Sequence, residues 1–197
     1  MALKFHYNKT TIQQFKRQLA IREKALPILK NKETALRLHV EKLTRDLEEL
    51  QAQKKELSQK MENFAPFWNE FPEILFMNAH EISQERLIGV KIPKFKPVEF
   101  RVADVSWWNL PAWIPSGLGL MKEFIQLDLK QEIFQKQIEL LDLARKKTTQ
   151  KVNLYEKVQI PGFEDAILKI KRFLEDKENI SKAAQKIVKK RKERRAT

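Results

Sequence analysis

The sequence has no cysteine and only four glycines among its 197 residues. Without cysteine the chain can form neither a disulfide framework nor a thiolate metal site, which suits a reducing compartment such as the cytoplasm. Four glycines leave few positions for tight turns, while 33% of the residues are charged. These features argue against a globular fold with many turns and favour long helices.

Long apolar stretches are missing as well. Nowhere do eighteen apolar residues follow one another, and the N-terminal MALKFHYNKTTIQQ lacks an apolar segment of the length that a signal peptide needs. We therefore expect no membrane span and no secretory leader. Any association with a membrane would have to come through partner proteins.

Catalytic signatures are also absent from the sequence. None of the glycines lies in a phosphate-loop pattern, and His6, His39 and His80 have no partners at metal-ligand spacing. Neighbouring carboxylates such as Glu48 and Glu49 are interpreted as solvated helix faces. We expect a protein that is not an enzyme, with no catalytic residue, no cofactor and no metal site.

A heptad pattern from Ile12 to Phe64 is the strongest positive signal. Thirteen of its sixteen core positions are apolar, and the residues between them are mostly Lys, Arg, Glu and Gln. The pattern predicts a helix of about 53 residues, roughly 80 Å long at ~1.5 Å per residue, which needs a partner along its length. The core positions are Ile12, Phe15, Leu19, Arg22, Leu26, Leu29, Glu33, Leu36, Val40, Leu43, Leu47, Leu50, Lys54, Leu57, Met61 and Phe64. The three polar ones are interpreted as residues that set the register or extend their charged ends to solvent.

Two local signals qualify this first helix. Thr10 and Thr11, each with a glutamine three residues later, predict a capping box and a helix that begins near Thr11. Pro27 removes one backbone donor inside the pattern, so we expect a kink there. Because the heptads continue in phase beyond Pro27, a single bent helix is favoured over two separate ones.

The composition changes between residues 66 and 119, which hold six of the eight prolines, three of the four glycines and all four tryptophans. This composition predicts a compact insert. Alternating apolar and polar residues at 88–92 and 98–102, on either side of Pro93 to Pro97, predict a small β-hairpin. So many tryptophans cannot all be buried in a short insert, so we expect a small core together with a docking surface, and at least one outward ring in the Trp107-Trp108 pair. The docking candidates are Phe95, Trp107, Trp108 and Trp113.

A helical period returns from about Leu118 and predicts a second long helix. Pro161-Gly162 interrupts the pattern, which then resumes in a shifted phase, so we expect a kink or a stutter at Pro161. The predicted fold is all-α: an antiparallel two-helix coiled coil with the insert at its turn, divided into segments 1–64, 65–117 and 118–197. Equal counting from the insert sets Ile12 opposite Ile170 and leaves up to about 27 residues of the second helix without a partner.

The net charge of +13 is concentrated at the two termini. Residues 1–40 hold nine basic and two acidic side chains, residues 181–197 hold eight and one, and the remaining 140 hold 22 and 23. Basic ends of this kind indicate nucleic acid, an anionic surface or an acidic protein socket as the partner. If the termini meet, they form one basic tip, for which the candidate residues are Lys16, Arg17, Lys186, Lys189, Lys190 and Arg191.

The segment KVNLYEKVQIP at 151–161, followed by FEDAI, resembles the C-terminal signature of the D subunit, the central shaft of V-type and A-type rotary ATPases. The N-terminal segments KRQLA at 16–20 and LKNK at 29–32 resemble the basic opening of the same family. Lys157, Gly162 and the Trp107-Trp108 pair depart from the usual pattern, which suggests a divergent bacterial branch. The signature residues that match in order and spacing are Val152, Asn153, Glu156, Val158, Ile160, Pro161, Glu164 and Ile167.

The resemblance implies a function as a non-catalytic rotor shaft that couples ATP hydrolysis or synthesis to ion transport. Its implied partners are the A and B subunits of the ring, the small F subunit of the stalk and the funnel-shaped C/d subunit of the rotor. The basic tip would contact the ring, and the aromatic insert would dock at the distal end. The implied location is cytoplasmic and peripheral to the membrane, with ATP bound by the partners.

Two other interpretations stay open from the residues alone. The run KKRKERR at 189–195 is also typical of a nucleic-acid-binding tail, so a coiled-coil nucleic-acid-binding or scaffolding protein is the alternative. A hairpin adaptor that associates with itself is the third. With the resemblance, we expect no binding to nucleic acid.

Overall fold

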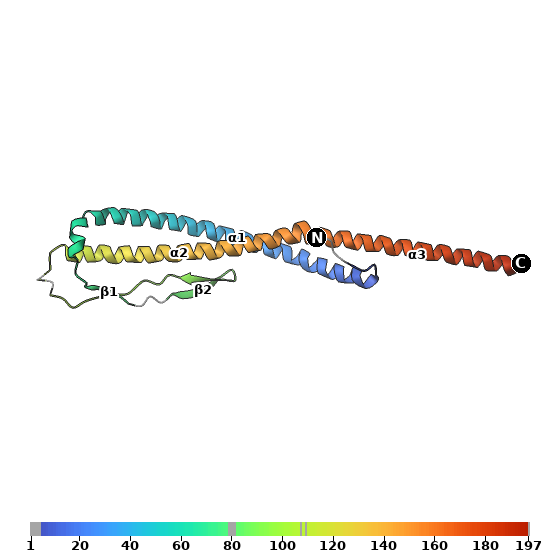
Figure 1. Ribbon diagram of the computed structural model, residues 1–197, viewed down its shortest axis with the longest axis horizontal. Coiled ribbons are helices and arrows are strands. Elements are labelled where there is room, and N and C mark those ends of the chain that lie inside the picture. The colour runs from blue at the N-terminus through green and yellow to red at the C-terminus, as the bar shows by residue number, and fades with distance from the viewer. Residues whose placement is uncertain (1–4, 79–81, 107, 109, 197) are drawn as a thin grey trace. The chain divides into compact units, whose positions relative to one another are not determined.

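The computed structural model describes residues 5–78, 82–106, 108 and 110–196. These residues are mostly helical, with a long N-terminal helix, a long C-terminal helix and a small β insert, as the sequence predicts (Figure 1). The chain divides into two compact units, one of residues 1–32 with 147–197 and one of residues 33–146. The elements are α1 (Lys9–Glu62), the 3-10 helix η1 (Ala65–Glu70), β1 (Leu75–Met77), β2 (Ser83–Leu87), β3 (Val90–Lys94), β4 (Phe100–Val102), α2 (Ile114–Leu154), the π-helical turn η3 (Tyr155–Gln159) and α3 (Ile160–Ala196).

Helix α1 begins one turn before the predicted capping box. The backbone N–H of Thr11 donates to Oδ1 of Asn8 at 2.7 Å, so Asn8 caps the helix and the prediction of a cap at Thr10 and Thr11 is wrong. Asparagine is among the best N-cap residues because its short side chain reaches the free N–H groups of the first turn. Pro27 lies inside α1, which continues across it as one helix, as the unbroken heptad phase predicts. A bend at Pro27 stays a prediction.

The heptad register of α1 is confirmed. All sixteen predicted core positions are buried or half-buried, and Leu36, Leu50 and Leu57 are 0%, 4% and 4% exposed. Apolar side chains that repeat every three and four residues lie on one face of a helix, so one stripe of α1 is covered along its whole length.

In the unit of residues 33–146, α1 and α2 run antiparallel. Leu36 lies in one apolar cluster with Leu141, and further along α1 the ammonium of Lys54 pairs with the carboxylate of Asp128. Because the partner on α2 comes earlier as the residue on α1 comes later, the two helices have opposite directions. A second cluster forms where α2 begins, around Ile74, Ile114 and Leu118.

The insert is an arm of two antiparallel ribbons that share one register. Strand β1 pairs with β4, with Leu75 opposite Val102, and β2 pairs with β3, with Leu87 opposite Val90. The chain therefore turns at Ile88-Gly89, where both residues have positive φ angles of 51° and 79°. A two-residue turn with both φ angles positive is the preferred connection of a tight β-hairpin.

A β-hairpin in the insert is confirmed, but the predicted strands are wrong. Residues 98–102 do not pair with 88–92: Phe100–Val102 pairs with β1, and Pro93 lies within β3 opposite Gln84. Each of these ribbons has only two strands, so β3 has a free side on which a proline removes no ladder hydrogen bond. The proline-rich segment therefore belongs to the arm and does not form its turn.

The arm packs back onto α2. The side-chain amide of Gln137 donates to the backbone carbonyl of Pro93, and Ile92 is buried with Leu36 and Leu141. Figure 1 shows both ribbons beside α2. Helix α2 starts at Ile114, earlier than the expected Leu118, since Pro115 is tolerated in a first helical turn.

In the unit that holds both termini, α1 runs antiparallel to the segment formed by η3 and α3. The rings of Phe15 and Phe163 are 5.3 Å apart, and those of Tyr7 and Phe173 are 4.7 Å apart. Ile12 lies in one groove with Lys171 and Leu174, close to the predicted level of Ile170. The predicted pairing of the helix ends is therefore observed.

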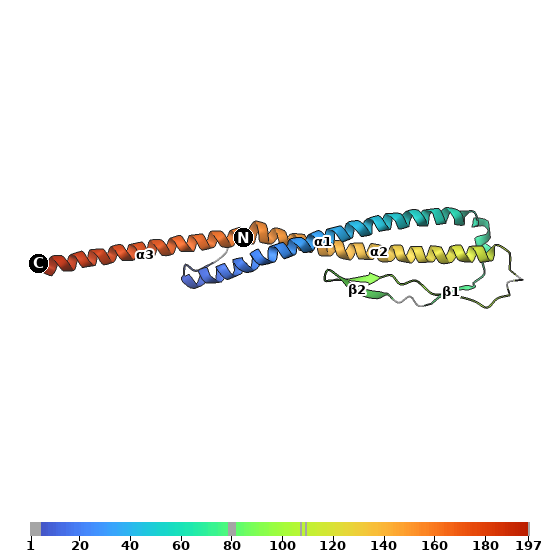
Figure 2. The ribbon, with the colours of Figure 1, turned by 180° about the vertical axis from the view of Figure 1, so that it is seen from behind.

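Beyond this pairing, α3 continues without cover. From Glu175 onward every side chain that the structure describes is exposed, and Figures 1 and 2 show no other element beside this end of α3. Ile180, Ile187 and Val188 are 71%, 56% and 53% exposed. The prediction of a C-terminal helix end without a partner in this chain is confirmed.

The predicted irregularity at Pro161 is present as the π-helical turn η3. The N–H of Ile160 donates to the carbonyl of Tyr155, five residues earlier, instead of four. A π-helical turn holds one extra residue, which shifts the phase of everything after it. This explains why the apolar pattern resumes at Phe163 in a new phase.

Candidate interaction surfaces

The signature residues at 152–161 lie on and around η3. Val152 is buried and Ile160 half-buried, whereas Asn153, Glu156 and Pro161 are exposed. The carboxylate of Glu156 pairs with the ammonium of Lys30 on α1 at 2.7 Å. This segment thus joins a packed inner face to an outer face that carries polar groups.

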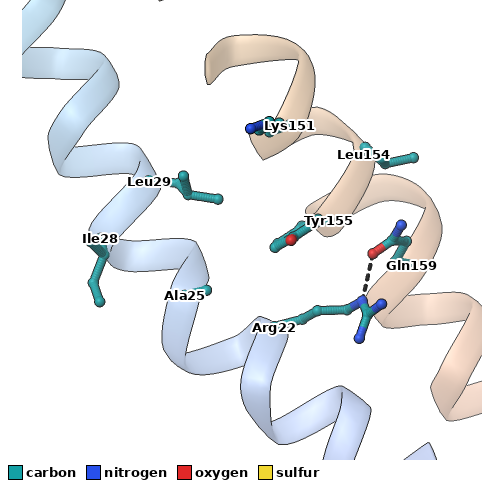
Figure 3. A pocket seen from close by; sticks show the side chains of 8 residues that line it. All are labelled: Arg22, Ala25, Ile28, Leu29, Lys151, Leu154, Tyr155 and Gln159. Carbon is teal, nitrogen blue, oxygen red and sulfur yellow. Dashed lines mark hydrogen bonds between the residues drawn. The ribbon is translucent and has the colours of Figure 1, made fainter. Parts of the chain in front are cut away.

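Arg22 ties α1 to η3 (Figure 3). Its Nε donates to Oε1 of Gln159 at 2.5 Å, and its Nη1 donates to the backbone carbonyl and the side-chain oxygen of Gln18. The guanidinium carbon also lies 4.7 Å from the ring centre of Phe163 and 5.8 Å from that of Tyr155. A planar guanidinium can make these hydrogen bonds and ring contacts together, which a lysine cannot. Arg22 is therefore the polar core residue that sets the pairing at this level.

A shallow groove of about 470 Å³ opens beside this contact, between α1 and the segment that enters η3. We call it the Arg22 groove. Figure 3 shows Arg22 toward one end, Lys151 toward the other, and Leu29 and Tyr155 between the two helices. Its lining residues are Arg22, Ala25, Ile28, Leu29, Lys151, Leu154, Tyr155 and Gln159.

The predicted basic tip is divided into two basic surfaces. Lys16 and Arg17 are exposed on α1 next to Phe15, which contacts Phe163. Lys186 and the residues that follow lie more than twenty residues further along α3, or roughly 35 Å at 1.5 Å per residue. Both surfaces are exposed, so each is available to a partner separately. The C-terminal surface comprises Lys186, Lys189, Lys190 and Arg191.

The predicted docking aromatics are divided as well. Trp113 is half-buried in a cluster of rings, where its ring centre lies 5.6 Å from that of Phe67 and 5.9 Å from that of Trp68. Gly117 is required there, since a Cβ at this position would lie 3.0 Å from the Trp113 ring. Trp108 is 97% exposed, and Phe95 is half-buried. The prediction of at least one outward ring is confirmed by Trp108, while Trp107 lies outside the described residues.

Electrostatic shifts are confined to helix surfaces. Hydrogen bonds from Lys146 and from Arg145 lower the pKa of Asp142 below its usual value. A hydrogen bond from Lys182 likewise lowers the pKa of Glu178. Within the described ranges there is no group of three or more His, Asp or Glu that could hold a metal ion, and no helix is long and apolar enough to cross a membrane.

Several interacting residues carry no recognisable sequence signal. Gln159, Gln137 and Lys30 look like ordinary surface residues of a helix, and only their partners across the fold distinguish them. Asn8 could have been found, because asparagine one turn ahead of a periodic pattern is a standard helix start.

Comparison with known proteins agrees with the signature. Residues 11–190 match the family model for the D subunit of ATP synthase. The chain is 28% identical over 189 residues to the V-type ATP synthase D subunit of Borreliella burgdorferi, covering 94% of both chains. It is 27% identical over 197 residues to the protein of the same name from Chlamydia muridarum, covering 97% of both. Since the model spans both long helices and the insert between them, the chain belongs to the family of ATP synthase D subunits.

Proposed function

We propose that this chain is the non-catalytic central-stalk subunit, or rotor shaft, of a V-type rotary ATPase. The observation that carries the proposal is the family match over residues 11–190, together with relatives named as V-type ATP synthase D subunits that align over nearly their whole length. In this role the chain couples ATP hydrolysis or synthesis in a catalytic ring to ion transport by rotation. The family match favours this role over the nucleic-acid-binding alternative.

The contacts within each unit suit a part that carries torque. A shaft must keep its two helices from sliding past each other, and contacts at several levels do this better than one. In the terminal unit these contacts are the Phe15–Phe163 ring pair and the Arg22–Gln159 hydrogen bond. In the other unit they are the buried Leu36–Leu141 cluster and the Lys54–Asp128 pair. We propose that the paired helices form an antiparallel coiled coil, and that segments 1–64, 65–117 and 118–197 serve as its first strand, its insert and its second strand.

The two basic surfaces are proposed to face the A and B subunits of the ring. Exposed lysines and arginines make weak, screened contacts that break and reform readily, which suits a surface that must meet each ring subunit in turn. The uncovered apolar residues of α3, Ile180, Ile187 and Val188, add area that a surrounding partner would bury. The signature around Glu156 and Pro161 lies between these two surfaces along the chain.

The insert is proposed to dock on the funnel-shaped C/d subunit, with the F subunit bound along the shaft. Trp108 and the partly exposed Phe95 supply the apolar area for this contact. Trp113 would support the insert from inside through its ring cluster. The chain would then be peripheral to the membrane, on its cytoplasmic side, and reach it only through the complex.

Co-expression with the A, B and F subunits of the same source tests the proposal. The expected result is one complex that retains the chain through purification and hydrolyses ATP, with lower activity when the chain is omitted. Reversal of Lys189, Lys190 and Arg191 to glutamate should weaken incorporation, whereas reversal of Lys42 and Lys55, which are exposed on α1 outside the basic surfaces, should not. An A, B and F complex that never retains this chain would refute the role.

A further inference from the structure

The Arg22 groove is not used by the proposed contacts of the basic surfaces or the insert. We propose that it binds an acidic, amphipathic helical segment of another protein chain. An apolar side chain of that segment would rest between Ile28 and Leu154, with one carboxylate at the Arg22 end and one at the Lys151 end. This inference goes beyond the proposed function and does not require it, because the groove is formed entirely by residues of one compact unit.

The two sides of the groove are apolar and uncovered. Ile28 is 68% exposed on α1, and Leu154 is 43% exposed on the opposite side. Leu29 and Tyr155 are half-buried between them, and Ala25 is too small to fill the space (Figure 3). Large apolar side chains on both sides of a groove leave area that a bound apolar group would remove from water.

The charge of the groove is positive. Arg22 and Lys151 are its two charged lining residues, and both are cationic. The nearby carboxylate of Glu156 is already paired with Lys30 at 2.7 Å. Lys151 is exposed and has no ion pair within the part of the chain that the structure describes. A ligand with carboxylates would therefore complement the groove, and one with cations would be repelled.

The spacing of the two charges fits a helix. Lys151 and Gln159, the residue that Arg22 reaches, are eight residues apart, or about 12 Å at 1.5 Å per residue. Two glutamates seven residues apart on one face of a ligand helix are about 10.5 Å apart, and flexible side chains cover the difference. A leucine midway between them would face the apolar sides of the groove. A nucleic acid offers a continuous line of phosphates but no aliphatic side chain for Ile28 and Leu154, so it fits less well.

The test measures binding of a labelled probe peptide to the full chain by fluorescence anisotropy. The probe is an alanine-based helix of about 15 residues with two glutamates seven residues apart and leucines midway between them. A second peptide has glutamine in place of both glutamates. We expect the glutamate peptide to bind at least about tenfold more tightly than the glutamine peptide, with the difference shrinking as salt is added.

Three variants assign the site. Lys151→Glu should weaken the glutamate peptide about tenfold, and Ile28→Ser about fivefold, because one reverses a charge and the other removes an apolar side of the groove. Lys24→Glu is the matched control: it reverses an exposed lysine on α1 that does not line the groove, and affinity should change less than about twofold. Circular dichroism checks that each variant keeps its helix content.

The outcomes separate this inference from the proposed function. Equal affinity for the two peptides, or equal effects of Lys151→Glu and Lys24→Glu, would overturn the groove site even if the chain assembles into an active ATPase. A single-stranded oligonucleotide of matched length that binds more tightly than the peptide and is lost in Lys151→Glu would also overturn it, in favour of nucleic acid. Peptide binding with no ATPase assembly would support the groove and refute the shaft.

Discussion

Replacing Leu36 by alanine tests the packing of the unit of residues 33–146 most directly. Leu36 is 0% exposed and lies in one buried cluster with Ile92 from the insert arm and Leu141 from α2. This one side chain therefore contributes to the contacts that hold α1, α2 and the arm together. Leu38, two residues later on the same helix, is 60% exposed and serves as the control.

The expected magnitude follows from the carbons removed. Leucine to alanine removes three carbons, which at ~0.8 kcal/mol each is about 2.4 kcal/mol for a fully buried side chain. The cavity that remains raises the total to roughly 3–4 kcal/mol. At Leu38 only about two fifths of the side chain is covered, so the loss is about 1 kcal/mol. The small gain in helix propensity from alanine is the same at both positions and cancels in the comparison.

Urea denaturation followed by circular dichroism measures both variants. Leu36→Ala should lower the free energy of unfolding by at least about 2 kcal/mol more than Leu38→Ala, with an unchanged urea dependence. Combining Leu36→Ala with Leu141→Ala should give a loss that differs from the sum of the single losses by about 1 kcal/mol, because the two side chains share one cluster. Leu36→Ala with Leu57→Ala should be additive within about 0.5 kcal/mol, since these sites are far apart on α1. Losses at Leu36 and Leu38 that agree within about 0.5 kcal/mol would refute the packing described here.

Three further predictions test other features. Leu47→Asp, at a core position of the heptad register, should reduce helix content and thermal stability, whereas Glu48→Lys on the exposed flank should change little; equal losses in circular dichroism would show that the register is wrong. Asn8→Ala should cost about 1 kcal/mol, because it removes the acceptor of the first-turn N–H, and faster hydrogen exchange confined to the start of α1 would show it. The pKa of Asp142 is lowered in the folded chain by hydrogen bonds, first of all from Lys146, so its stabilising effect is present above the unfolded-state pKa of about 4 and is lost as the pH falls through the lower folded-state pKa. Thermal melts of Asp142→Asn should accordingly differ from the wild type at pH 7 and converge with it in acid, and a constant difference would contradict this.

The helices could be predicted from the sequence because their signal is repeated many times. One misplaced residue hardly weakens a register supported by sixteen positions, and Arg22, Glu33 and Lys54 are tolerated within it because each finds a partner. The phase shift at Pro161 was visible for the same reason, since the apolar positions on both sides are well defined. The π-helical form of the shift could not be predicted, as it depends on which backbone groups pair.

The insert arm was harder to predict because its strands are short and mostly polar. Strand β2, with Glu85 and Arg86 at its centre, has no alternating apolar face, and tertiary contacts to α2 hold its partner strand β3 in place. The turn at Ile88-Gly89 puts isoleucine at a positive φ, which propensity disfavours. The prolines nearby are a stronger local signal, so the prediction placed the turn in the wrong segment.

Candidate contact residues were predictable as types but not as surfaces. Composition indicated that some tryptophans are buried and others exposed, but only the fold shows that Trp113 packs over Gly117 while Trp108 is exposed. Likewise the basic residues of the two ends were evident, whereas their separation depends on how far α3 extends past the start of α1. Contacts between side chains from distant segments, such as Lys30 with Glu156, have no signal in a single sequence.

The π-helical turn constrains chain length as well as side-chain chemistry. If one residue were deleted from Tyr155–Gln159, the segment could close into an ordinary α-helix, and every later residue would rotate by about 100° around the axis. Phe163 and Ile170, now buried, would turn away from α1 although neither had been changed. Insertions and deletions in this turn should therefore be selected against as strongly as polar substitutions in the core, and an alignment of relatives at this level of identity should place its gaps elsewhere. The number of residues between Val152 and Phe163 is as much a part of the family signature as the residues themselves.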